Sequence, residues 1–509
     1  MTERYDAIVI GAGHNGLVCA IRLAQSGKRV LLLEAANRVG GLAVTEEFHD
    51  GFWVSTGAQL LHQLQPAVMK AIGVRVPSVV ERMATVVLAE DGDHVRLLDN
   101  DVSGPASGEA AAFAEFRQLG LRLARFLNQQ FLRRPPRFDG DTRRLARLGL
   151  GLRLLGKADM RELLRLVGQN MHDEVNARFS HPLLKAAVCL DAVTGTHTGP
   201  RSPGSVVTWL HRLAGQDGAV SQPAGGVGAV SEALAARAVK LGVELRTGQP
   251  VDRIVVDNGR VAGVESGGER FESWTVISNA DPKTTVQRLV GERHFETSYL
   301  KRIHHYRSDG NVAKLHLALD GLPEAAGLDD TDFQSRLLIA PGEDAIEAAF
   351  NPAKYGEFSA DPVMEISLPS AADDRCAPEG QHVLSAIVQY APYRLAGGWT
   401  DDARDRFTDL CLQTLSRYFP DISRRVVALE LMTPVDIEHR FGVYGGHWHH
   451  GEIGLDQFMF TRPVVGASQY RQPLDGLWLC GAGTHPGGGV SGAPGYNAAE
   501  AILELEQRR

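Results

Sequence analysis

The sequence has few cysteines, little excess charge and no long apolar run, and each shortage excludes a class of protein. None of the five cysteines forms a Cys-x-x-Cys pair, which argues against a redox-active disulfide. No apolar run reaches the ~18 residues of a membrane span. The formal net charge of −8 gives no reason to expect nucleic acid as a partner. Because one hydrophobic core rarely serves more than ~250 to 300 residues, we expect two domains.

A glycine-rich turn lies close to the start of the chain. It follows the apolar run 5–10 and precedes the helix-like stretch 17–25, which is the strand-turn-helix setting of a dinucleotide-binding fingerprint. Its glycines permit a tight turn, a close approach of the backbone to a pyrophosphate, and close packing of the helix on the strand. We therefore expect these residues to bind a dinucleotide: Gly11, Gly13, His14, Asn15 and Gly16.

A second apolar run, 29–33, ends at Glu34, which comes 18 residues after Gly16. An acidic residue about 20 residues beyond the fingerprint accepts a ribose hydroxyl, so Glu34 is the expected ribose ligand. The next loop resembles the second diphosphate-contacting loop of glutathione-reductase-like and amine-oxidase-like flavoproteins. It adds the following residues to the expected site: Ala35, Arg38, Gly40, Gly41 and Leu42.

The C-terminal segment favours FAD over NAD. The run 476–480 predicts a strand, a glycine-rich turn follows it, and 498–503 predicts a helix whose N-terminus would stabilise negative charge on a reduced flavin ring. No second Gly-x-Gly-x-x-Gly follows a strand, so a second nucleotide site is not expected. We expect non-covalent FAD, contacted here by Gly481, Ala482, Gly489, Val490, Ser491 and Gly492.

Residues 222–282 form another stretch of regular α/β pattern, with a helix that ends near Leu241 and β-hairpins at glycine-containing turns. We expect a strand around Val251 to hold the adenine, and we place Asn279, which follows the apolar run 274–277, in the same cofactor site.

The predicted fold class is α/β, α+β overall, with a Rossmann-like FAD-binding domain of the glutathione-reductase or amine-oxidase type. This domain is discontinuous in sequence, and an α+β substrate domain is inserted into it. The FAD-binding domain is predicted to comprise residues 1–76, 220–290 and 431–509, and the substrate domain residues 77–219 and 291–430.

The stretch 117–165 is strongly basic in an acidic chain. It holds thirteen lysines and arginines against four acids, and basic and bulky apolar residues alternate from 145 to 155. One interpretation is a helix on a membrane surface that admits a lipidic substrate; the other is a helix packed on the protein with a solvated basic face. The expected location is the cytoplasm, or the mitochondrial matrix in a eukaryote, with peripheral membrane contact as the alternative, because the first strand leaves no room for a signal peptide.

The order of these motifs resembles the phytoene desaturase and carotenoid isomerase family of FAD oxidoreductases over nearly the whole chain. Within it, the segments 444–452 and 487–492 are similar to the group called pyridine nucleotide-disulfide oxidoreductase domain-containing protein 2. Two departures stand out. Many relatives have an arginine where this chain has Leu42, and amine-oxidase relatives usually have an acid where this chain has Ala482.

The resemblance implies flavin-mediated hydride transfer at an unactivated C–C bond of a long apolar polyene, isoprenoid or acyl substrate. Three candidates for catalysis follow: His485 in the C-terminal turn, Lys314, and His447. A structural role for His485 is an equal alternative. Lys314 and His316 share one face of the predicted strand 312–319, and this face is expected to point either to the flavin pocket or to water. The histidines from 447 to 450 lack a Cys or carboxylate ligand pattern, so no metal site is expected and a solvated turn is the simpler interpretation.

Two further hypotheses stay open. An amine or small-molecule oxidase would have a short pocket walled by aromatic residues and would produce peroxide, whereas the leading hypothesis predicts a long apolar tunnel. A flavin-stabilised interaction protein with little turnover would explain why no catalytic triad or metal cluster stands out.

Overall fold

The computed structural model describes residues 4–137 and 140–507. Four strands of its first sheet consist almost entirely of apolar residues and are fully buried. The sheet is parallel throughout and has the order β10-β2-β1-β14-β20. Its strands are β1 (Ala7–Ile10), β2 (Val30–Leu33), β10 (Glu244–Arg246), β14 (Val276–Ser278) and β20 (Leu477–Leu479). Burial on both faces of a parallel sheet explains why these runs are apolar without alternation.

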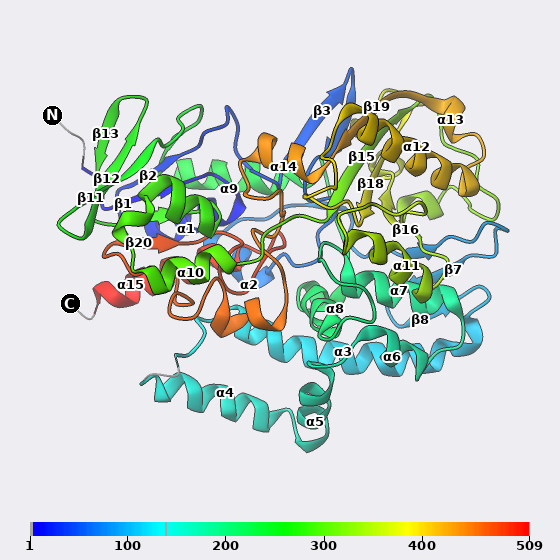
Figure 1. The fold of residues 1–509 in the computed structure, drawn as a ribbon, viewed down its shortest axis with the longest axis horizontal. Coiled ribbons are helices and arrows are strands. Elements are labelled where there is room, and N and C mark those ends of the chain that lie inside the picture. Colours follow the sequence, from blue (N-terminus) through cyan, green and yellow to red (C-terminus); the bar gives the residue numbers. More distant parts are fainter. Residues whose placement is uncertain (1–3, 138–139, 508–509) are drawn as a thin grey trace.

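Different layers cover the two faces of this sheet (Figure 1). On one face, α1 (His14–Ala24) packs against α9 (Gly228–Lys240) and α15 (Ala493–Glu506). On the other face lies an antiparallel sheet of β11 (Arg253–Asp257), β12 (Arg260–Ser266) and β13 (Glu269–Glu272). The predicted Rossmann-like α/β architecture is therefore confirmed.

Parallel strands direct their carboxyl ends to one edge of the sheet, and this edge brings distant motifs together. Gly11 follows β1, Glu34 follows β2, Asn279 follows β14 and Cys480 follows β20. Ligands of such sheets bind beyond the carboxyl ends of the strands. The edge is therefore where the glycine-rich segments from both ends of the chain meet.

The second sheet has eight strands in the order β19-β15-β18-β17-β16-β6-β7-β8, antiparallel except for the pair β16 and β6. Its strands are β6 (Thr85–Val87), β7 (Val95–Leu98), β8 (Asp101–Ser103), β15 (Val312–Leu319), β16 (Arg336–Ile339), β17 (Met364–Ser367), β18 (His382–Gln389) and β19 (Val426–Met432). Strand β15, next to the edge strand β19, is buried along its whole length, so both of its faces are covered.

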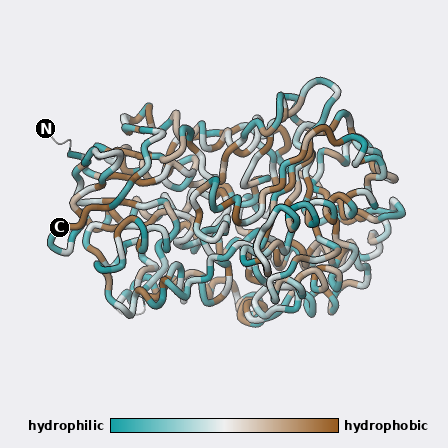
Figure 2. The backbone as a smooth tube through the Cα atoms, turned by 45° about the horizontal axis from the view of Figure 1, so that its top comes forward, coloured by the Kyte–Doolittle hydropathy of each residue, from teal (hydrophilic) through white to brown (hydrophobic). Residues whose placement is uncertain are grey.

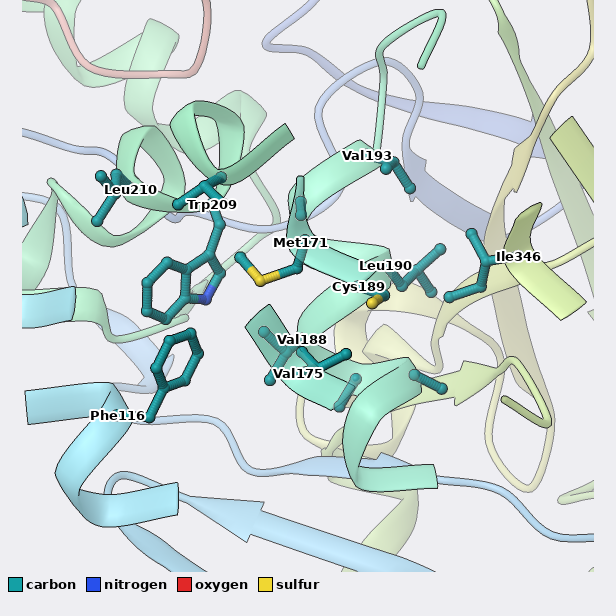
Figure 3. Packing of buried hydrophobic residues seen from close by; sticks show 14 of the residues in the cluster. Phe116, Met171, Val175, Val188, Cys189, Leu190, Val193, Trp209, Leu210 and Ile346 are labelled. Atoms are coloured by element: carbon teal, nitrogen blue, oxygen red, sulfur yellow. The ribbon is translucent and has the colours of Figure 1, made fainter. Parts of the chain in front are cut away.

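Helices pack beside this sheet and share one apolar core. Phe116 on α3 (Ala110–Phe131) stacks on Trp209 of α8 (Ser205–Leu213), with ring centroids 4.7 Å apart, and α7 (Pro182–Val193) contributes Val188 and Leu190 (Figure 3). The other helices on this side of the molecule are α6 (Met171–Asn176), α11 (Glu343–Ala353), α12 (Asp401–Tyr418) and α13 (Ile422–Arg425).

The helices α4 (Thr142–Leu154) and α5 (Lys157–Leu166) form a hairpin that projects from the body of the molecule (Figure 1). Elsewhere the hydrophobic stretches run through the interior of both halves (Figure 2). Among the described residues, no helix combines the length and the apolar character that crossing a membrane requires. The remaining β-strands and α-helices are β3 (Thr45–His49), β4 (Phe52–Ser55), β5 (Ser78–Val80), β9 (Gln222–Pro223), α2 (Pro66–Ile72), α10 (Thr297–His305) and α14 (Pro434–Phe441).

Two details of the sequence interpretation need correction. Val251 precedes β11 instead of lying in a strand, and the C-terminal helix begins at Ala493, five residues before the predicted start. Glycine and proline in 492–495 concealed that start, although proline is well tolerated in the first turn of a helix. The assignment of residues to two domains stays a prediction. Strand β19 crosses the predicted domain boundary between residues 430 and 431.

Candidate functional site

The first glycine loop has the close contacts that its sequence predicted. Gly11 has a φ of +92°, and a Cβ on Gly16 would lie 2.1 Å from the carbonyl oxygen of Gly11. A Cβ on Gly13 would lie 2.7 Å from the side-chain nitrogen of Asn279. The start of α1 has no side-chain cap and no acid in its first turn. Its free N–H groups are therefore open to a phosphate.

The second glycine loop lies directly against the first. The Gly40 amide donates to the carbonyl of Ala12 at 2.9 Å, and Gly13 and Gly40 form an isolated parallel bridge. Gly41 is exposed at this junction, with a φ of +56°. The two loops expected to hold one diphosphate are thus neighbours in space, although about 25 residues separate them in sequence.

Glu34 organises the backbone where a ribose is expected. Its carboxylate accepts hydrogen bonds from the amides of Ala12, at 2.6 Å, and Ala36, at 2.9 Å. Burial raises the pKa of this carboxyl group, and these amide donors partly offset the effect. The neighbouring Ala35 is exposed, and the half-buried Val251 packs on the apolar cluster beneath β11–β13.

Arg38 is exposed at the rim of this region, where it forms an ion pair with Glu46. Glu46 is buried and also contacts Arg440, whose Nη2 lies 3.1 Å from its carboxylate. One carboxylate thus lies between two guanidinium groups, and Arg38 is linked to the segment that follows the second sheet.

The C-terminal turn is held by a buried arginine, Arg462. A Cβ on Gly481 would lie 2.5 Å from the carbonyl oxygen of Asn279, so this glycine is needed for close approach to the loop after β14. The guanidinium of Arg462 donates to the carbonyl of Ala482 at 2.9 Å and to that of His449 at 2.8 Å. Further bonds reach the carbonyls of Gly451, Glu452 and Gln457.

The last glycines lead into the N-terminus of α15. Gly489 and Gly492 have φ values of +97° and +71°, and the Ser491 hydroxyl accepts from the amide of Ala493 at 3.2 Å. Gly489 and Val490 line the cavity described below. A helix N-terminus therefore approaches this cavity, as the sequence predicted, with positive dipole potential at that end.

The residues at the junction fit FAD by two independent features. Glycines hold the loops in contacts that a Cβ would prevent, and three buried polar atoms have no protein partner within the described chain: His14 Nε2, Asn15 Oδ1 and His450 Nδ1. Buried polar atoms normally have hydrogen-bond partners, so a polar ligand is expected here. Burial lowers the pKa of His14 to about 4, with His450 adding to the effect, which leaves a neutral ring able to donate or accept.

A cavity of about 110 Å³ lies beside these loops. Its wall includes five of the predicted cofactor residues: His14, Leu42, Ala482, Gly489 and Val490. Apolar side chains such as Leu60, Ile387 and Ile453 form another part of the wall. Expected cofactor contacts and apolar side chains thus share the wall of one cavity. The expectation of a long apolar tunnel stays a prediction.

The polar part of the wall is a charged cluster. Arg212 Nη2 donates to Glu365 Oε2 at 3.0 Å and to His62 Nε2 at 3.1 Å. Burial, with the charges of Arg212 and Arg336, holds the pKa of His62 well below its usual value, so the ring is neutral. Arg336 also pairs with Asp191 at 2.6 Å. Two guanidiniums therefore face two carboxylates, and the cluster carries no net charge.

His485 is fully buried but is not part of the cavity wall. Its Nε2 lies 3.0 Å from the carbonyl oxygen of Gln130, and its ring packs edge-on against Phe131. Burial lowers the pKa of His485 to about 4. These contacts agree with the structural alternative, and the catalytic role of His485 stays a prediction.

Lys314 lies behind the cavity wall. Its Nζ donates to Gln59 Oε1 at 2.6 Å and to Ser385 Oγ at 3.1 Å, and Gln59 lines the cavity. Burial lowers the pKa of Lys314 to about 7. The interpretation that Lys314 and His316 face water is wrong, since both are fully buried. Lys314 therefore contacts the cavity wall only through residues such as Gln59, and its catalytic role stays a prediction.

The turn that contains His447 is not solvated, contrary to the expectation. His447 is buried, its Nδ1 accepts from the amide of His449 at 3.3 Å, and its Nε2 lies 3.5 Å from Glu452 Oε2. Of the two histidines, His449 lines the cavity, and burial keeps its pKa well below the usual value. The sequence analysis did not count Glu452 as a carboxylate partner of these histidines, although it lies beside His447. The expectation that no metal binds here stays a prediction.

Sequence reasoning missed most of the polar wall. Arg212 ends an ordinary amphipathic helix and His62 lies in a loop, so neither has a local signal. Glu365 is the exception, because a carboxylate inside the short apolar strand β17 needs a buried partner. Other missed wall residues include Gln59, Gln63, Thr194, Thr208, His211 and Trp448.

Comparison with known proteins agrees with this geometry. The family model described as flavin containing amine oxidoreductase matches residues 16–503. The rat protein named pyridine nucleotide-disulfide oxidoreductase domain-containing protein 2 is 34% identical, over 99% of this chain and 94% of its own length. A lycopene-forming phytoene desaturase of Pantoea ananas is 25% identical, over 98% of each chain. Both likenesses confirm the resemblance found in the sequence.

A solved structure supports the fold independently. An oxidoreductase from Methanosarcina mazei superposes with a TM-score of 0.62 at 18% identity, covering 98% of this chain and 99% of the other. Since the family model spans nearly all of the chain, and the two glycine loops and the C-terminal turn meet at the edge of one parallel sheet, this chain belongs to the flavin containing amine oxidoreductase family.

Proposed function

We propose that this chain is an FAD-dependent oxidoreductase that transfers hydride to or from a C–C bond of a lipophilic substrate, giving desaturation, saturation or isomerisation. The observation that carries the proposal is the shared wall of the cavity: predicted cofactor residues form one side, and the apolar side chains of Leu60, Ile387 and Ile453 form another. A non-covalently bound FAD would supply the hydride acceptor or donor.

The protein's own contribution is to exclude water and to orient the substrate. Hydride transfer at a C–H bond depends on a dry, aligned pocket more than on a strong acid–base pair. Leu60, Ile387 and Val490 provide the apolar wall, and Arg212 with Glu365 provides a polar corner. This mixed wall suits a substrate that is apolar where it reacts and carries a hydrogen-bonding group nearby, with the rest of a long molecule outside the cavity.

The likeness to a phytoene desaturase supports action on C–C bonds, because that relative is named for such a reaction. A second candidate, oxidation of a compact amine or alcohol, is favoured by the small volume of the cavity and by the Glu365 carboxylate in its wall. The third possibility, a flavin-stabilised protein with little turnover, has only the lack of an evident catalytic triad or metal cluster in the sequence in its favour.

Anaerobic reduction of the purified holoprotein tests the proposal. Flavin absorbance would be followed while polyenes, isoprenoids and acyl compounds are added, with chromatography of the products to detect isomerisation. We expect one of these lipophilic classes to bleach the flavin or to be isomerised. Bleaching by amines or alcohols alone, with peroxide formed in air, would establish the second candidate. A yellow protein that changes no compound of any class would refute the proposal.

A cavity-filling variant locates the reaction. Ala58 lines the cavity, so Ala58→Leu should slow reduction by the active compound at least tenfold while reduction by dithionite is unchanged. Ala71→Leu is the matched control, because Ala71 is exposed on α2, away from the cavity. Equal rates in the wild type and both variants would place the reaction elsewhere.

A further inference from the structure

The hairpin of α4 and α5 has one packed face and one open face. The inner face of α4 carries Leu148, Leu152 and Leu155, which pack against the core of the helical layer. The outer face carries Leu150 and Leu154, whose side chains are 55% and 76% exposed. Leucines on both faces are unusual in a helix that only covers its own protein, where the outer face is polar.

The open face is also basic. Residues 142–166 contain seven cations against two acids, although the whole chain has a net charge of −8. In the part of the chain that the structure describes, five of these cations have no ion-pair partner: Arg143, Arg147, Arg153, Lys157 and Arg161. The three cations on α4 lie on the same exposed side as Leu150 and Leu154, and on α5 the exposed Leu164 (68%) accompanies Lys157 and Arg161.

We propose that this hairpin docks the protein on the surface of an anionic lipid membrane, with Leu150, Leu154 and Leu164 inserted among the headgroups. Interleaved leucine and arginine on one helix face is the pattern of helices that lie in the membrane interface, where cations attract anionic lipids and apolar side chains enter the boundary. The hairpin projects from the body of the molecule, so it can reach a flat surface (Figure 1).

A protein partner fits this face less well. A stable interface buries ~800 Å² on each side and depletes charge at its centre. The hairpin instead mixes three separated leucines with five unpaired cations. A membrane accepts this mixture, because each cation can meet a phosphate or a carboxylate while each leucine inserts.

The hairpin is connected to the cavity through the end of α3. Leu148 and Gln130 line one small surface pocket, and Phe131, the last residue of α3, packs against His211 with ring centroids 5.4 Å apart. His211 belongs to the cavity wall. Docking through α4 and α5 would therefore bring a lipid surface to the side of the molecule where α3 ends at the cavity.

Flotation of the full-length protein with vesicles tests the proposal. We expect binding to phosphatidylcholine vesicles that contain phosphatidylserine, weaker binding to pure phosphatidylcholine, and release by salt. The triple variant Arg143→Gln/Arg147→Gln/Arg153→Gln should lower the partition coefficient about a hundredfold, since each cation near an anionic surface contributes about fivefold. Leu150→Ser/Leu154→Ser should lower it by about tenfold or more.

Matched controls distinguish a local effect from a change in total charge. Lys301→Gln/Arg302→Gln/Arg424→Gln removes the same charge from exposed sites outside the hairpin, and Val239→Ser removes an exposed apolar side chain of α9. Both should bind like the wild type, and all variants should keep the wild-type melting temperature. Absence of vesicle binding by the wild type, equal loss in the control and hairpin triple variants, or a hairpin-dependent dimer without vesicle binding would overturn the proposal.

Discussion

The packing of Gly16 against Gly11 allows a sharp test of the cofactor site. In the variant Gly16→Ala, the new Cβ would lie 2.1 Å from the Gly11 carbonyl oxygen, whereas ordinary contacts lie beyond 3.4 Å. The loop and the start of α1 must therefore separate by more than 1 Å at the point where a diphosphate is expected. Overpacking of this size costs about 1 to 3 kcal/mol. We expect the dissociation constant for FAD to rise by about 5- to 150-fold, since ~1.4 kcal/mol corresponds to a factor of ten.

The measurement is a fluorescence titration of apoprotein with FAD, together with the flavin content of the purified protein. Gly149→Ala is the matched control, because Gly149 also lies within a helix and a Cβ added there would have nothing within 4 Å. That variant should bind FAD normally and gain up to ~1 kcal/mol of stability. Circular dichroism establishes that Gly16→Ala is folded. A folded Gly16→Ala protein with wild-type affinity for FAD would refute this reasoning.

Three further changes test other parts of the site. Glu34→Gln retains one acceptor oxygen for the amides of Ala12 and Ala36, so FAD affinity should fall about tenfold in the same titration; unchanged affinity would contradict the ribose assignment. Arg462→Lys removes donors from several buried carbonyls and should lower the free energy of unfolding in urea by about 3 kcal/mol, whereas a loss below ~0.5 kcal/mol would contradict its clamping role. Lys314 has a pKa lowered by burial to about 7, so from pH 7 to 9 the unfolded chain binds a proton that the folded protein has released. Stability should rise by about 2 kcal/mol over that range, and this rise should be missing in Lys314→Met; identical pH profiles in urea unfolding would contradict it.

Local signals were sufficient for the cofactor loops. Gly11, Gly13 and Gly16 are dictated by backbone contacts within one strand-turn-helix unit, and the apolar run before Glu34 specifies a buried parallel strand. The order of such units along the chain also predicted the Rossmann-like sheet. The start of α15 was misplaced because its first turn contains residues that resemble a loop, and the fold places them at a helix N-terminus.

The cavity wall was decided by tertiary structure alone. Arg212, His62 and Glu365 come from a helix end, a loop and a strand that lie about 150 residues apart, and nothing in their local sequence shows that they meet. The same holds for His447 and His485, whose burial depends on what packs around their turns. The sequence by itself thus determined the backbone geometry that suits FAD, because short-range sterics demand glycine there. Which side chains surround the cavity, and which histidines stay neutral, depended on long-range packing, because burial and charge partners arise only when distant segments come together.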